Sequence, residues 1–479
     1  MIMDLGVNKD YIKFRYEVLF IFTLFEVLLY DGDIGAQLIV SIIEYLFILF
    51  TFGLNRRIGI MYFLSFTLLS MGAWSYVIQE TLPYNFWGLR VFGYSVNIIF
   101  SIILLFLSLL SDNFKYKLAF DDLASKFLTV FILYSLFQGI VWLMFSVNYF
   151  DNFLKDSLLY LPYFVYMYLL GWLNITQLLK IVRYCISLTV ISMLLSLFFN
   201  QLFQYGEGFY FVLMNSFAFV VIFSIFFLRD LYSGLHYYLL LISTFFLLIT
   251  GSVFIGSKMV IILFILIFWI IIFFAKARRL FFFTILLLFF FVGPLIAWVS
   301  NNISSDLVIS YKFLQIYEVF SLINLDSIAS SNTSMGNVVA EGVTIFKYLK
   351  ENPIALIFGK GFGGATPDIY GYLAPMVGDG AGYAQVDLNR NAYVRMHLPI
   401  YEVIIKSGIF GVSVYLTLLV KSFKSKNIFS LIFFVLLFTV FSNTKEMLLL
   451  SLVFMRLSTY LSSSMMVSEK FVNNYNTKG

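Results

Sequence analysis

Charged residues are scarce in this chain. Asp, Glu, Lys and Arg make up 12% of the 479 residues, against about 25% in an average soluble protein, whereas hydrophobic residues make up 61%. A soluble fold cannot bury so much apolar surface. Cys185 is the single cysteine, which excludes a disulfide or a thiolate metal cluster within one chain. The net charge of +5 is not gathered into a basic block, which excludes a nucleic-acid-binding domain.

The apolar residues form long runs, such as residues 259–274 and 280–299. A helix of about 20 residues crosses the roughly 30 Å hydrocarbon core of a bilayer. The sequence therefore predicts an all-α, polytopic membrane protein with about fourteen transmembrane helices. The predicted spans centre near residues 22, 44, 68, 100, 137, 165, 191, 219, 243, 266, 289, 409, 435 and 454.

Basic residues are distributed unequally between the two sides that these spans define. With the N-terminus in the cytoplasm, the short outer loops hold only Arg90, Lys155, Lys258 and Lys445, and most other basic residues fall on the inner side. Lys and Arg concentrate in the cytoplasmic loops of membrane proteins. We therefore expect both termini to be cytoplasmic and the segment 300–396 to lie outside.

This outer segment divides the chain into three parts. Residues 1–299 hold predicted helices 1–11, residues 300–396 form one long polar loop, and residues 397–479 hold predicted helices 12–14 and a cytoplasmic tail. The loop is rich in Gly, Asn, Asp and Pro, which makes it too polar to lie in lipid.

One stretch of the long loop, residues 338–349, has the periodicity of an amphipathic helix. Its apolar positions are Val339, Val343, Phe346 and Leu349. We expect this helix to lie at the membrane interface, to end at Asn352 and Pro353, and to be followed by a flexible glycine turn at residues 359–364.

A second part of the loop, residues 366–391, places charged and amide side chains among glycines and tyrosines. Such a surface suits hydroxyl-rich ligands. The residues that we expect to contact sugar are Tyr383, Asp387 and Asn391.

Two glycine motifs do not indicate nucleotide binding. Residues 359–364 match GxGxxG, but no strand precedes them and the topology places them outside, so a dinucleotide fold is rejected. Residues 251–258 imitate a phosphate loop, but the order is Ser257-Lys258 and the predicted location is again extracytoplasmic.

His397 lies where the long loop enters the next predicted helix, and the chain has only two histidines. A histidine with an ordinary pKa can accept a proton from a sugar hydroxyl at neutral pH. The alternative is an interfacial histidine whose ring reaches toward water. Glu402 is the competing candidate for the base.

Several cations are predicted to gather at the outer mouth of the bundle. Arg395, Glu402 and Lys406 are spaced to share one helix face, which also fits a purely structural ladder of ion pairs. Alternatively, guanidinium groups bind the oxygens of a phosphate or pyrophosphate. The candidate pyrophosphate ligands are Arg390, Arg395, Lys258, Lys360 and Arg90.

Three stretches resemble the family of O-antigen and lipid-linked oligosaccharide polymerases and ligases. Gly-Ser-Lys at 256–258 resembles that family's Gly-Ser-Arg at the start of a helix. Residues 349–353 and 358–363 resemble its amphipathic helix, proline and Gly-x-Gly turn. Residues 397–402 with Gly-Ile-Phe-Gly at 408–411 resemble its passage from loop to helix.

The resemblance implies a membrane glycosyltransferase of the GT-C type in the bacterial inner membrane, with a periplasmic active site. It would transfer an undecaprenyl-pyrophosphate-linked glycan onto a lipid-linked repeat unit. Because such a donor carries its own leaving group, we expect no nucleotide or other cofactor. We expect no metal either, because cationic side chains supply the charge that a metal would provide.

Two alternatives stay open on the sequence. An O-antigen ligase would differ only in its acceptor, the lipid A core. A flippase for lipid-linked oligosaccharides would be a transporter, with two related halves and charges in mid-membrane. The expected partners are undecaprenyl-pyrophosphate-linked oligosaccharides and the bilayer, with a chain-length-regulating co-polymerase as a further candidate and no nucleic acid.

Overall fold

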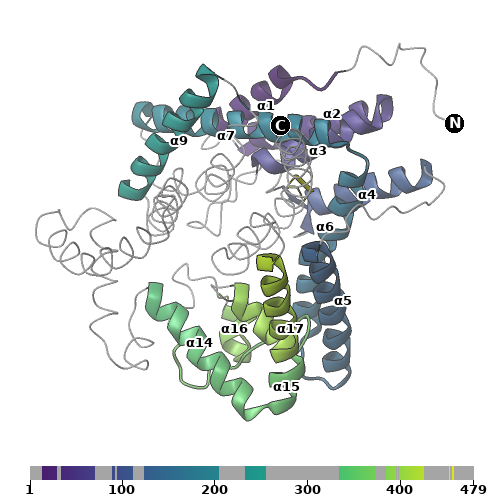
Figure 1. Ribbon diagram of the computed structural model, residues 1–479, viewed down its shortest axis with the longest axis vertical. Coiled ribbons are helices and arrows are strands. Elements are labelled where there is room, and N and C mark those ends of the chain that lie inside the picture. Colours follow the sequence, from purple (N-terminus) through teal and green to yellow (C-terminus); the bar gives the residue numbers. More distant parts are fainter. Residues whose placement is uncertain are drawn as a thin grey trace, which may run out of the picture. The chain divides into compact units, whose positions relative to one another are not determined.

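The computed structural model describes residues 13–29, 34–70, 89–91, 94–111, 123–203, 232, 234–254, 334–373, 385–394, 396, 399–424, 453 and 456–457. These residues are mostly helical (Figure 1). The chain forms two units, each built from two separate segments. Unit 1 comprises Met1–Asn97 and Lys180–Ile323, and unit 2 comprises Ile98–Leu179 and Asn324–Gly479.

Unit 1 is built on a group of three N-terminal helices. Its elements are α1 (Tyr16–Leu28), α2 (Ile34–Leu54), α3 (Arg56–Ser70), the short antiparallel strands β1 (Arg90–Val91) and β2 (Tyr94–Ser95), α7 (Ile175–Phe203) and α9 (Leu235–Phe254). Helix α2 packs against both α1 and α3. Aromatic rings pack these three helices together. The centre of the Phe22 ring on α1 lies 5.7 Å from that of Phe47 on α2 and 5.2 Å from that of Phe66 on α3.

Unit 2 joins central helices to the described part of the long loop. Its elements are α4 (Val96–Ser111), α5 (Leu123–Met144), α6 (Phe150–Gly171), α14 (Ser334–Glu351), α15 (Pro353–Phe358), α16 (Gln385–Arg390) and α17 (Pro399–Lys424). Helix α17 packs against α15 and α5 (Figure 1). The described part of the loop therefore belongs to unit 2 rather than forming a separate body.

The helices lie where the apolar runs predict them. Those centred near residues 22, 44, 68, 100, 137, 165, 191, 243 and 409 fall within helices α1–α7, α9 and α17. Two helical segments, Gly35–Leu54 and Ile175–Leu195, are long and apolar enough to cross a membrane. The predicted spans near residues 219, 266, 289 and 435 lie outside the described residues, and of the span near residue 454 only residues 453, 456 and 457 are described. The number of spans therefore stays a prediction.

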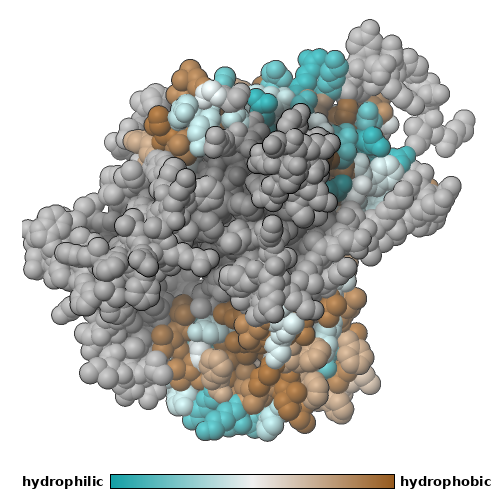
Figure 2. Space-filling view, viewed as in Figure 1, coloured by the Kyte–Doolittle hydropathy of each residue, from teal (hydrophilic) through white to brown (hydrophobic). Residues whose placement is uncertain are grey.

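Several helices expose apolar side chains and bury polar ones. On α2, Ile39 is 58% and Phe50 is 65% exposed, whereas Ser41 and Glu44 are each 1% exposed. Figure 2 shows hydrophobic residues gathered on the visible surface of unit 2. This distribution agrees with the expectation of an apolar surrounding for α2.

Helix α14 confirms the predicted helix in the long loop, and its placement at a membrane interface stays a prediction. Of the expected stripe only Leu349 is fully buried, and Phe346 is 59% exposed. The buried side is instead lined by Ala340, Thr344 and Ile345. Small residues let this side of the helix approach Tyr401 of α17, whose hydroxyl would lie 2.6 Å from a Cβ added at Gly342.

Candidate functional site

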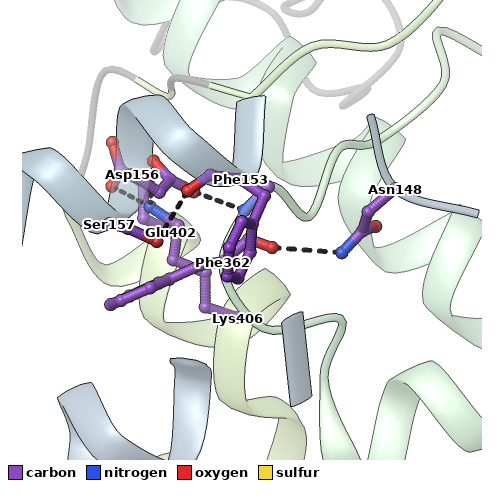
Figure 3. Close-up of polar contacts among 8 residues, drawn as sticks. Asn148, Phe153, Asp156, Ser157, Phe362, Glu402 and Lys406 are labelled. Carbon is purple, nitrogen blue, oxygen red and sulfur yellow. Dashed lines mark hydrogen bonds and ion pairs between the residues drawn. The ribbon is translucent and has the colours of Figure 1, made fainter. Parts of the chain in front are cut away.

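A buried ionic cluster links α6 to α17. The ammonium of Lys406 lies 2.9 Å from Glu402 Oε2, one turn earlier on α17, and 3.2 Å from Asp156 Oδ1 on α6 (Figure 3). The three side chains are 1%, 8% and 7% exposed. Two carboxylates thus share one ammonium in a place where an unpaired charge would be costly.

Aromatic rings cover this cluster. The Lys406 ammonium lies 5.5 Å from the centre of the Tyr160 ring. Phe362 stacks on Tyr160 with ring centres 5.0 Å apart and an angle of 8° between the planes. Burial raises the desolvation cost of the charges and strengthens their mutual attraction, so the cluster holds α6 and α17 in one register.

The glycine turn at residues 359–364 packs between α5 and α17. Helix α17 is broken at Gly408, where φ is 60° and ψ is −162°. In an unbroken helix each carbonyl accepts a hydrogen bond from the N–H four residues later, and the break interrupts that pattern. The carbonyls of Ile405 and Lys406 accept instead from the N–H groups of Lys360 and Gly361, at 2.7 and 2.9 Å.

Further contacts fix the turn from the α5 and α6 side. Phe362 N–H donates to the carbonyl of Ser135 at 2.8 Å, and Asn148 Nδ2 donates to the carbonyls of Lys360 and Phe362 at 2.8 and 3.1 Å. Gly363 N–H donates to Asp156 Oδ2 at 2.7 Å. Asp156 therefore joins the turn to the ionic cluster.

Glycine is required in this turn for two reasons. Gly359 and Gly361 have φ of 72° and 68°, a region that other residues rarely adopt. A Cβ added at Gly361 would lie 2.0 Å from the backbone nitrogen of Gly139, and one at Gly408 would lie 2.6 Å from that of Gly359. The missing side chain at Gly408 therefore lets the turn lie directly against the break in α17. The turn itself is confirmed, but it is buried and hydrogen-bonded, so the expectation of a flexible turn is wrong.

Lys360 is buried within the turn. It is 5% exposed, and its ammonium donates to the carbonyl of Ala365 at 2.8 Å and lies 5.1 Å from the centre of the Tyr348 ring. Burial lowers the pKa of Lys360 to about 8. Binding of pyrophosphate by Lys360 stays a prediction, and it would require the ammonium to leave Ala365.

Arg390, at the end of α16, is paired with α6. Its Nη1 donates to both carboxylate oxygens of Asp151, at 3.0 and 2.8 Å, and its guanidinium carbon lies 4.6 Å from the centre of the Tyr149 ring. The Arg390 side chain is 35% exposed. This partial exposure leaves it accessible to an anion in solution.

Asn391 holds the polar part of the loop together. It has φ of 46°, and its Oδ1 accepts from the N–H of Asp368 at 2.7 Å. An antiparallel bridge joins Thr366 and Tyr393 beside it. Asp387 is half-buried in α16. Neither residue is placed against a sugar, so both sugar contacts stay predictions.

The other predicted site residues are not described. His397, Arg395, Lys258 and Tyr383 lie outside the described residues, and of Arg90 only the backbone, in β1, is described. The structure thus brings together Glu402 and its neighbour Lys406, and separately positions Arg390, but it does not place the proposed base.

No protein-family model, curated protein or solved structure matches the chain. Any function proposed for the chain therefore rests on its own residues and their arrangement.

Asp156 was missed by the sequence analysis, although Glu402 and Lys406 were paired correctly from their spacing of four. The pairing of Asp156 with Lys406 spans 250 positions. The available signal was its placement beside the predicted outer end of an apolar helix, where a charge requires a partner.

Proposed function

We propose that the chain is a membrane glycosyltransferase that polymerises lipid-linked oligosaccharides at the outer face of the bacterial inner membrane. One observation carries the proposal. Two of the stretches that resemble the polymerase and ligase family, the Gly-x-Gly turn and the Gly-Ile-Phe-Gly passage, lie far apart in sequence but contact each other directly, since Gly359 packs against Gly408. Independent coincidences of sequence would not be expected to meet.

The distribution of polarity supports a membrane setting for these helices. Exposed apolar residues recur along α2, α4 and α5, whereas Gln37, Ser41, Ser101 and Ser135 are buried. Hydrocarbon favours this arrangement, because lipid solvates apolar surface and leaves polar groups to pair within the protein.

The long loop has its own apolar surface. Phe346 of α14 and Ile354, Ile357 and Phe358 of α15 are all between about half and two thirds exposed. An interfacial helix buries such residues in the headgroup region. The loop would therefore lie on the membrane surface with its glycine turn inserted into unit 2.

Side-chain pairing agrees with the proposed sidedness. Arg390 of the loop pairs with Asp151, and Lys155 lies 3.9 Å from the same carboxylate, all three on the proposed outer side. In unit 1, Lys180 donates to the carbonyl of Phe14 at 3.0 Å, both on the proposed inner side. Each of these contacts joins residues assigned to the same face.

We assign separate roles to the ionisable residues. Glu402 is buried and its carboxylate holds Lys406, so we assign it to positioning α17 and keep the role of general base for His397. Arg390 would bind the pyrophosphate of a lipid-linked sugar, together with Arg395, Lys258 and Arg90. No nucleotide is needed, because undecaprenyl pyrophosphate is already the leaving group.

The proposal is tested with purified protein and a defined lipid-linked repeat unit. A ladder of products is expected, and H397A should lose it while keeping normal membrane insertion. H236A is the matched control and should extend chains normally. Absence of products from the wild-type protein with a correctly loaded acceptor would contradict the polymerase. In cells, deletion should leave single repeat units on the lipid core; a bare core would indicate the ligase.

A transporter of lipid-linked oligosaccharides is the second candidate. Glu44 favours it, because this buried carboxyl lies midway along a candidate membrane span. Translocation of a lipid-linked unit across liposomes without any product ladder would select this function.

A further inference from the structure

Helix α2 carries a polar stripe along its buried face. Gln37, Ser41, Glu44 and Thr51 are all buried, at spacings of four, three and seven residues. Such spacings place them on one side of a helix, opposite the exposed apolar residues. Within such a stripe an ionisable side chain is the member that marks a functional site, because a charge inside a membrane is costly.

Glu44 occupies the centre of this stripe. It is the eleventh of the 21 residues of α2 (Ile34–Leu54), which puts it roughly 15 Å along the axis from either end. The segment Gly35–Leu54 is one of the two candidate membrane spans. If α2 crosses the bilayer, as the proposed topology requires, Glu44 lies near the bilayer midplane.

The carboxyl group of Glu44 has no protein partner among the described residues. It is 1% exposed, and neither Oε1 nor Oε2 makes a hydrogen bond. An ionised carboxylate in such a place would lose its hydration without gaining any compensating contact. A bound proton removes that cost, because the neutral carboxyl group is far cheaper to bury.

Among the residues that the structure describes, the charged groups near Glu44 do not supply a positive partner. Of the helices packed against α2, α1 contributes Glu26, which is half-buried and interacts electrostatically with Glu44. The cations of α3 are Arg56 and Arg57, the first two residues of that helix, and they lie next to the end of α2 rather than beside Glu44. The hydroxyl of Tyr62, also on α3, accepts a hydrogen bond from the backbone N–H of Arg15. Because a second carboxylate nearby disfavours the ionised form of Glu44, the site favours a cationic ligand, and the smallest such ligand is a proton.

We propose that Glu44 is an intramembrane proton-binding site of unit 1, with Glu26 as its neighbouring carboxyl. The bound form is the carboxylic acid, and release returns one proton and the carboxylate. This site is separate from the glycine turn and the ionic cluster of unit 2. It depends on the membrane placement of α2 but not on glycosyl transfer, so failure of either proposal can be recognised without the other.

A membrane-permeant carbodiimide tests the protonated state directly. The carboxyl proton moves to a carbodiimide nitrogen, the carboxylate oxygen bonds to the central carbon, and the adduct rearranges to a stable N-acylurea without losing any atom. Full-length protein in vesicles is treated with dicyclohexylcarbodiimide and the modified peptide is identified by mass spectrometry. Glu402 is the internal control, because its carboxylate is buried like that of Glu44 but is hydrogen-bonded to Lys406.

We expect adduct on Glu44, little on Glu402, and loss of the Glu44 adduct as the pH is raised. E44Q should remove the adduct and keep the thermal midpoint of the wild type, because the amide mimics a protonated carboxyl. E26Q should keep the adduct. The proposal is overturned if Glu44 stays unmodified or if its modification does not depend on pH. It is also overturned if E44Q unfolds the protein. Protection of Glu44 by sodium ions at constant pH would overturn it too, because the ligand would then be a metal cation.

Discussion

Lys406 is the single cation on which the buried cluster of unit 2 depends. Without it, Asp156 and Glu402 would face each other as two buried carboxylates. Removing one partner of a buried ion pair destabilises a protein much more than replacing both partners by uncharged residues, because the remaining charge stays desolvated and unpaired.

We therefore expect K406M to destabilise the protein by about 3–5 kcal/mol. The measurement is the thermal midpoint of purified protein in detergent. K155M is the matched control, because the Lys155 side chain is 65% exposed and its surface pair with Asp151 should contribute under about 1 kcal/mol. The triple variant D156N/E402Q/K406M should recover much of the loss. Equal effects of K406M and K155M would contradict this account.

The buried position of Lys360 should make the stability of the protein depend on pH, with a sign that can be worked out. Its pKa falls from 10.5 to about 8 because of burial, so between these values the unfolded chain binds a proton that the folded turn does not. Stability should therefore rise as the pH increases from about 8 toward 10 and be insensitive to Lys360 below that window.

The thermal midpoint of the wild type, measured against that of K360M, should increase by a few degrees across this window, since about 1 kcal/mol corresponds to about 2–4 °C in a domain of 150–250 residues. K350M, at an exposed position of α14, is the control and should follow the wild type. A difference that stays flat with pH would show that Lys360 does not titrate there.

Part of the site could be predicted at the scale of single residues. The spacing of Glu402 and Lys406 places them on one helix face, and they do pair. The pairing of Lys406 with Asp156, and of Arg390 with Asp151, could not be predicted. Helical periodicity shows which side chains share one face of a helix, but it does not show which distant helix packs against that face.

At the scale of elements, the glycine turn and the break in α17 are complementary. The turn provides backbone donors, and the break leaves backbone acceptors beside them. Sequence analysis located the turn, but it described the turn as flexible. Glycine-rich composition indicates conformational freedom in the unfolded chain and does not show whether the folded turn is solvated or enclosed.

Alanine at Gly361 should prevent the turn from seating against α5. The added Cβ would lie 2.0 Å from Gly139 N, and φ is already 68°, so we expect a loss of about 2 kcal/mol or more. Gly371 is the matched control, because its φ is 75° but no atom lies within 4 Å of an added Cβ. G371A should cost only about 1 kcal/mol, from backbone strain alone.

Unfolding in detergent and limited proteolysis of the 334–373 segment would measure this difference. G361A should expose the segment to protease while G371A should not. Equal protection of both variants would mean that the turn does not depend on its close approach to α5.

At the scale of the whole molecule, the sequence predicted a mostly helical protein, and the described residues are mostly helical. It also predicted a long loop between helices, and the described part of that loop contains α14, α15 and α16. The way in which the loop packs into unit 2 was not predictable, because the contacts between α15 and α17 depend on backbone geometry rather than on hydrophobic pattern.

Membrane sidedness can be tested with single cysteines, because the native Cys185 is buried and easily replaced. In a C185S background, a cysteine at Glu351 should react with an impermeant maleimide added to intact cells. A cysteine at Arg57 should react only after permeabilisation, since both positions are exposed but are assigned to opposite faces. The reverse pattern would place the long loop in the cytoplasm and remove the proposed glycosyl transfer.

The capped break in α17 also constrains the order in which the protein is made. The N–H donors at positions 360 and 361 leave the ribosome before the carbonyls of Ile405 and Lys406, and the Ser135 acceptor precedes them all. Under the proposed topology, the turn is exported and can pack against α5 before α17 is inserted. The two carbonyls of α17 then meet donors that are already in place, whereas delayed export of the turn would leave both carbonyls without a partner in lipid.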